Sequence, residues 1–155
     1  MLHAESLRQD PRIAQAKQLI AEAMRDHSAS MTDVSPSDPD QSASYQSLID
    51  GFTSARGGPP IWPYFASGLG NGPYVELADG SVKLDFIGGI GVHGGGHSNP
   101  DLVSASIDAA IEDTVMQGNL QQNPASVEMM QRLVSLASES GAPLEHVLLS
   151  TSGAM

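Results

Sequence analysis

The chain has 155 residues, a length typical of one domain, and carries 18 Asp and Glu residues against 7 Lys and Arg, which gives a formal net charge of −11. A chain this acidic, with no basic patch, repels phosphate backbones, so nucleic acid is not expected as a partner. Cysteine is absent, which excludes disulfides and thiolate metal sites. No apolar run reaches the ~18 residues of a membrane helix, and the first residues lack the features of a signal peptide, so we expect a soluble cytoplasmic protein.

A helical pattern near the N-terminus is followed by a polar segment. Pro11 suits the first turn of a helix, and apolar residues recur at helical spacing through residues 11–27. Residues 28–44 are rich in Ser, Asp and Pro, so little apolar burial is available to offset the entropy of ordering them. We predict a helix over 11–27 and a flexible linker over 28–44.

Aromatic side chains gather in an irregular segment, residues 45–72. A short helix is expected over 45–52, and a Gly-Gly-Pro-Pro run ends it. Trp62, Tyr64 and Phe65 lie close together in a chain with only 5% aromatic residues. Two interpretations stay open: the rings dock the loop onto a core, or one of them lines a binding pocket.

Asp79-Gly80 separates two short runs of β-forming residues. This dipeptide is favoured in tight hairpin turns, which require positive φ at the two central residues. The sequence therefore predicts that residues 74–77 pair antiparallel with residues 82–87.

Six glycines crowd the stretch FIGGIGVHGGGHSNPDLV, residues 86–103. Ser98 and Asp101 stand three apart, as in a capping box, and predict a helix that begins at the following Pro and ends at Gly118. A second helix is expected over 123–141. After it come a short apolar strand, residues 147–149, and a small polar turn.

The glycine stretch invites two ligand interpretations, and both are weak. The letters Gly89-x-Gly91-x-x-Gly94 match a dinucleotide fingerprint, but the expected helix does not open directly after them, and no Gly-Lys-Ser/Thr follows for a P-loop. His93 and His97 stand four apart, but three glycines between them disfavour the helix that would align them on a metal. No metal is therefore expected, and the ring of His97 is expected to bond to nearby backbone.

The combined pattern resembles the class III pyridoxal-phosphate-dependent aminotransferases. Members carry an Asp-Gly hairpin, then Asp-Phe (here Asp85 and Phe86), a turn of small residues, and Gly-His-x-x-Pro, here 96–100. The final Ser-Gly-Ala, 152–154, matches the turn that follows a strand in that family. The resemblance covers residues 60–155, approximately. It implies an α/β fold, fold type I, of which this chain would be the incomplete N-terminal portion.

The resemblance implies pyridoxal 5'-phosphate as the cofactor. In the family the Ser-Gly-Ala turn opens a helix whose backbone N–H groups hold the cofactor phosphate, so Ser152, Gly153 and Ala154 are expected to bind it. Unpaired N–H groups and the positive end of a helix dipole favour an anion, which agrees with this assignment.

The resemblance also implies substrate contacts and a partner. Ile90 stands where members place a substrate-facing side chain, and Trp62 and Tyr64 belong to a segment that contributes to the substrate pocket. Residues 119–122 match a segment near the dimer interface of the family. The expected ligands are an amino donor and a 2-oxo acid, and the expected assembly is a homodimer.

Two departures limit what the chain is expected to do. Met155 stands where members often have Glu, and the chain contains only Lys17 and Lys83, neither in the context of the family's Schiff-base lysine. We therefore expect a fragment that is inactive alone. Its expected divisions are an N-terminal helix, a linker, an arm with a small-domain segment, and the start of the cofactor-binding domain, at residues 1–27, 28–44, 45–143 and 144–155.

Two other functions remain open. The chain could be a non-catalytic interaction module derived from this family, which the sequence beyond residue 155 would distinguish. It could also be a nucleotide-binding domain that uses the glycine stretch. A comparison of NAD binding with pyridoxal phosphate binding would distinguish this function from that of an aminotransferase.

Overall fold

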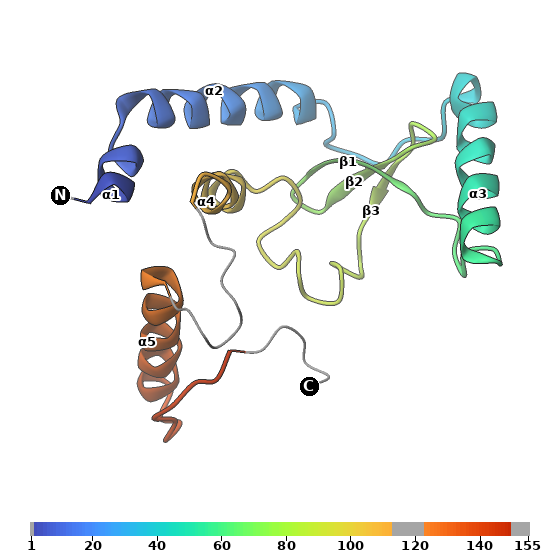
Figure 1. Ribbon diagram of the computed structural model, residues 1–155. Helices are drawn as coiled ribbons and strands as arrows, with labels where there is room; N and C mark the ends of the chain where they lie inside the picture. The colour runs from blue at the N-terminus through green and yellow to red at the C-terminus, as the bar shows by residue number, and fades with distance from the viewer. Residues whose placement is uncertain (1, 113–122, 150–155) are drawn as a thin grey trace. The chain divides into compact units, whose positions relative to one another are not determined.

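The computed structural model describes residues 2–112 and 123–149 (Figure 1). It divides into two compact units, Met1–Asp108 and Ala109–Met155. Helices and one small antiparallel sheet make up the described residues, which is compatible with part of an α/β fold. The four divisions expected from the sequence stay a prediction.

Two helices open the first unit. α1, His3–Arg8, was not expected from the sequence; the Glu5 side chain closes its first turn by accepting a hydrogen bond from the Leu2 N–H at 2.8 Å. α2, Pro11–Ser28, confirms the predicted helix. Its N-cap is Asp10, whose carboxylate accepts from the Arg12 N–H at 2.9 Å, and proline occupies the first turn.

The segment expected to be a linker makes contacts that its composition did not indicate. Met31 is 5% exposed, and its carbonyl oxygen accepts from the Asn71 side chain at 3.2 Å. Ser35 forms an antiparallel bridge with Val82, and a short 3₁₀ helix, η1, follows at Pro39–Gln41. Backbone groups make most of these contacts, so they leave little trace in side-chain composition.

α3, Ser42–Arg56, is longer than the predicted helix over 45–52. Gly57 ends it in the left-handed conformation, φ 79°, and donates its N–H to the Thr53 carbonyl at 3.0 Å. Phe65 packs edge-on against Phe52 and Tyr45, with ring centroids 5.4 and 6.3 Å away. Phe65 therefore docks this loop against α3, a helix with no buried residues, so docking onto a core stays a prediction.

The sheet is an antiparallel meander of β1 (Ala66–Asn71), β2 (Tyr74–Leu77) and β3 (Val82–Leu84) (Figure 1). The predicted pairing of β2 with β3 is confirmed, although β3 ends three residues earlier than expected. β1 was not expected; two glycines and an irregular register weaken its pattern.

The hairpin turn differs in detail from the prediction. Only Gly80 has positive φ, 78°, and Asp79 does not. The Leu77 N–H donates to the Ser81 carbonyl at 2.8 Å, which encloses a three-residue loop with glycine in the left-handed position. The dipeptide thus marked the turn correctly but not its length.

The buried apolar side chains among the described residues cluster at the sheet. Leu77 and Val82 are 6% and 8% exposed, and Met31, from the segment before α3, completes the group. This core is small because many large apolar side chains on the helices and on the turn after β3 are exposed. None of the helices in the described residues combines the length and apolar character needed to cross a membrane.

α4, Pro100–Ala110, begins as predicted but differs at both ends. The expected cap at Ser98 is wrong: Asn99 caps the helix, accepting from the Asp101 and Leu102 N–H groups at 2.9 and 3.3 Å. α4 ends at Ala110, earlier than expected, and Gly118, the expected end, lies outside the described residues.

The second unit contains α5, Pro124–Glu139, which confirms the second predicted helix. Asn123 caps it, accepting from the Ser126 N–H at 2.8 Å, and Pro124 occupies the first turn. The strand expected over 147–149 is wrong, since those residues have no strand partner among the described residues.

Candidate functional site: the glycine turn

Residues 86–96, which we call the glycine turn, connect β3 to the segment before α4. Their backbone folds back on itself: the His93 N–H donates to the Gly88 carbonyl at 2.9 Å, and the Gly96 N–H to the His93 carbonyl at 2.8 Å. Positive φ occurs at four of the glycines and at Ile90, where φ is 60°. The glycines therefore serve the left-handed backbone that this turn requires.

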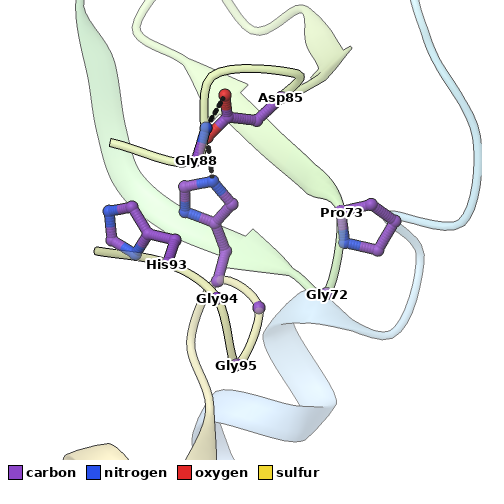
Figure 2. A pocket seen from close by; sticks show the side chains of 9 residues that line it. Gly72, Pro73, Asp85, Gly88, His93, Gly94 and Gly95 are labelled. Carbon is purple, nitrogen blue, oxygen red and sulfur yellow. Dashed lines mark hydrogen bonds and ion pairs between the residues drawn. The ribbon is translucent and has the colours of Figure 1, made fainter. Parts of the chain in front are cut away.

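Asp85 anchors the start of the glycine turn. One carboxylate oxygen, Oδ1, accepts from the Ile87 and Gly88 N–H groups at 2.8 Å each, and Oδ2 lies 2.7 Å from His97 Nε2. Figure 2 shows the link between Asp85 and Gly88. The Gly88 N–H, followed by the His97 ring, lowers the pKa of Asp85 to about 2 because both stabilise the ionised carboxylate.

His97 anchors the end of the glycine turn. Its backbone forms a bridge with Gly72, with N···O distances of 2.8 and 3.3 Å. Its side chain packs directly against the backbone of Gly70 in β1. A Cβ built on Gly70 would lie only 2.5 Å from His97 Cβ. The expectation that its ring bonds to backbone is wrong, since the ring bonds to the Asp85 carboxylate instead.

His93 stacks on His97, with ring centroids 4.3 Å apart and planes 28° from parallel. Stacking separates the two rings instead of directing their nitrogens at one point. The part of the chain that the structure describes contains no group of three metal-binding side chains.

A cavity of about 510 Å³ lies between the sheet and the glycine turn. Its apolar floor includes Val75 and Leu77 of β2, and Lys83 of β3 supplies a cation. Residues of the turn, including Phe86 and Ile87, line the other side. A mostly apolar cavity with few polar groups is typical of a small-molecule site.

The structure brings only part of the expected substrate group to this cavity. Tyr64 lines it, although the residue is 68% exposed. Ile90 belongs to the adjacent turn but is 91% exposed, and Trp62 is 69% exposed; neither lines the cavity. Their contact with a substrate stays a prediction.

The residues expected to hold the cofactor phosphate, Ser152, Gly153 and Ala154, lie outside the described residues, as does the 119–122 segment expected near a partner subunit. The pair formed by Asp85 and His97 was missed from the sequence. The usable signal was an Asp three positions before a Gly-Gly pair, because an Asp side chain in a turn often accepts from the backbone N–H two positions on.

The geometry gives no support to a dinucleotide fold at the glycine turn. α4 begins at Pro100, well after Gly94, and the preceding strand is the second arm of a hairpin. N–H groups that would have to hold a pyrophosphate instead bond to carbonyls of the turn, as at Ile90 and His93.

Comparisons with known proteins agree with the sequence resemblance. The family model described as Aminotransferase class-III matches residues 54–155. Glutamate-1-semialdehyde 2,1-aminomutase of Symbiobacterium thermophilum is 35% identical over 82 residues, or 53% of this chain, and acetylornithine aminotransferase of Aquifex aeolicus is 37% identical over 65 residues, or 42%. Each match spans 17% of that relative's length. No solved structure matches.

Proposed function

The chain belongs to the class-III aminotransferase family, and from that premise we propose that it forms the N-terminal part of an enzyme that transfers an amino group from an amino donor to a 2-oxo acid. The observation that carries the proposal is the family match over residues 54–155. The geometry of the glycine turn agrees with it, because this turn carries exposed apolar side chains beside a cavity. We further propose a fold of type I, a homodimer and a cytoplasmic location.

Pyridoxal phosphate, when bound, would supply the electron sink for amino transfer. We propose that Ser152, Gly153 and Ala154 hold its phosphate. The support is the family membership together with the small side chains of this sequence, which allow an anion to approach the N–H groups at the start of a helix.

Neither lysine of the chain fits the attachment of the cofactor. Lys17 Nζ is held by both carboxylate oxygens of Asp108 at 2.7 and 2.8 Å. Lys83 lies in β3 and lines the cavity, but its sequence context does not match the family's attachment lysine. We therefore propose that these 155 residues alone do not catalyse amino transfer, and that the lysine comes from another part of the protein.

On the substrate side, we propose that Ile90, Trp62 and Tyr64 contact the substrate. All three side chains are accessible, and Tyr64 reaches the cavity that the glycine turn lines. Apolar contacts of this kind select substrates by size and shape, with one methylene worth about 1–3 kcal/mol.

Intramolecular amino transfer is the second candidate, because one relative is named an aminomutase. A non-catalytic module is the third. It is supported only by the lack of a suitable lysine in these residues.

The test is an amino-transfer assay with pyridoxal phosphate, a panel of amino donors and a panel of 2-oxo acids. It compares the 155-residue chain with the product of the gene read beyond codon 155. We expect turnover from the longer product and none from the shorter chain. Turnover by the 155 residues, or a longer product that contains a cofactor lysine but is inactive on every pair, would contradict the proposal.

A further inference from the structure

We propose that Asp85 and His97 are positioning residues: their side chains latch the two ends of the glycine turn together and so fix where Ile90 is presented. The step from Ile90 to a substrate rests on the proposed function, whereas the latch itself does not. Asp85 and His97 are twelve positions apart in sequence, with the whole turn between them.

The latch joins groups that are largely shielded from water. The Asp85 and His97 side chains are 17% and 15% exposed, and Oδ2 and Nε2 lie 2.7 Å apart. A hydrogen bond to an ionised carboxylate is shorter and stronger than a neutral one. Because Oδ1 already accepts from Ile87 and Gly88, the carboxylate binds the start and the end of the turn at once.

The sheet and the loop between β1 and β2 hold the end of the glycine turn in place. His97 pairs with Gly72 through both backbone groups, and Ser98 Oγ accepts from the Gly70 N–H at 3.1 Å. Gly96 also lies against Gly72, since a Cβ on Gly96 would be 3.0 Å from Gly72 Cα. Through His97, Asp85 therefore ties the glycine turn to the loop between β1 and β2.

Ile90 needs such an anchor. A β-branched residue with φ of 60° is strained, and such a conformation persists only where the surroundings determine it. Packing does not hold Ile90, because its side chain is 91% exposed. Ile90 is held instead by backbone bonds, from the Ile90 N–H to the Ile87 carbonyl and from the His93 N–H to the Gly88 carbonyl, both 2.9 Å, and by the closure of the turn by Asp85 and His97.

The experiment uses the full 155-residue chain, labelled for NMR, without cofactor or substrate. Asp85→Asn and His97→Leu weaken or remove the latch. Asp101→Asn is the matched control, since it makes the same acid-to-amide change at an exposed position in the first turn of α4. His97→Gln restores a side-chain donor.

In the wild-type chain we expect the His97 proton to reside on Nε2. In His97→Leu we expect exchange of the His93 amide to accelerate about tenfold or more, and the Ile90 methyl resonance to shift, while the amides of α3 keep their wild-type rates. Asp85→Asn should move both readouts in the same direction, Asp101→Asn should move neither, and His97→Gln should lie nearer to wild type than His97→Leu.

An unprotonated Nε2 in the wild-type chain would overturn the latch. So would unchanged His93 exchange and Ile90 shift in both latch variants, or acceleration that is equal in the turn and in α3, which marks a general loss of stability. If His97→Leu does not fold, the test compares the Ile90 methyl shift in His97→Gln and in Asp85→Asn. The latch is overturned if the two variants depart equally far from the wild-type shift. None of these outcomes depends on amino transfer, so the latch and the proposed function fail separately.

Discussion

Gly70→Ala should destabilise the protein through one steric conflict. The added Cβ would lie 2.5 Å from His97 Cβ and 2.5 Å from the Tyr74 carbonyl oxygen, well inside van der Waals contact. The Tyr74 oxygen belongs to the sheet, and His97 is held by its bridge to Gly72, so neither neighbour moves without loss of hydrogen bonds. Overpacking of this kind costs about 1–3 kcal/mol, and we expect about 2 kcal/mol.

The matched control is Gly51→Ala. Gly51 lies inside α3, and no atom stands within 4 Å of the Cβ position, so the added methyl should stabilise the helix by about 0.5–1 kcal/mol. The two variants make the same chemical change with opposite expected signs.

Urea unfolding followed by circular dichroism measures both effects. At a slope of about 2 kcal/mol per molar urea, Gly70→Ala should lower the midpoint by about 1 M, whereas Gly51→Ala should raise it slightly. A Gly70→Ala midpoint equal to or above that of the wild type would refute the close packing of His97 on β1.

Three further predictions follow from the same contacts. The pKa of Asp85, about 2, lies below its ordinary value of 3.8, so its stabilising effect should be complete above about pH 4 and lost as the pH falls towards 2; a carboxyl titration by NMR with an ordinary midpoint would contradict this. Lys17→Met should cost less than about 1 kcal/mol, and less still in high salt, because the partly exposed ion pair with Asp108 is screened; a salt-independent loss in urea unfolding would refute this reading. Tyr45→Phe removes the hydroxyl that bonds the loop before β1 and should lower the fluorescence anisotropy of Trp62, the single tryptophan, whereas unchanged anisotropy would show that the hydroxyl does not order the loop.

The sequence correctly predicted the elements that are determined by short local patterns. Asp79-Gly80 marked the hairpin, and apolar residues at helical spacing marked α2 and α5, with Pro11 marking the start of α2. The sequence did not predict β1, because its glycines have low strand propensity and because β1 forms through pairing with β2, which is a non-local contact. The Ser98 cap failed because Asn99, one position later, is nearer to the helix and Ser98 Oγ is engaged by Gly70.

The sequence predicted where the candidate site lies but not which of its side chains contact each other. Glycine density marked a turn between the hairpin and α4, and the structure has that turn, with four of its glycines in the left-handed conformation. The pairing of Asp85 with His97 depends on how the turn folds back to Gly72, and no local pattern encodes a contact between residues so placed. The structure likewise separates Tyr64, at the cavity, from Trp62, although they are near neighbours in sequence.

The most direct test of the central claim, that the glycine turn is the substrate side of an aminotransferase, is the kcat/KM of Ile90→Ala in the amino-transferring protein. Because Ile90 is 91% exposed, and Ala is less strained than a β-branched residue at a φ of 60°, the change should not lower the urea midpoint. We predict a loss of about tenfold or more in kcat/KM, and none in the control Leu2→Ala, which is exposed and lies outside the family match. A kcat/KM equal to that of the wild type for Ile90→Ala would contradict the account.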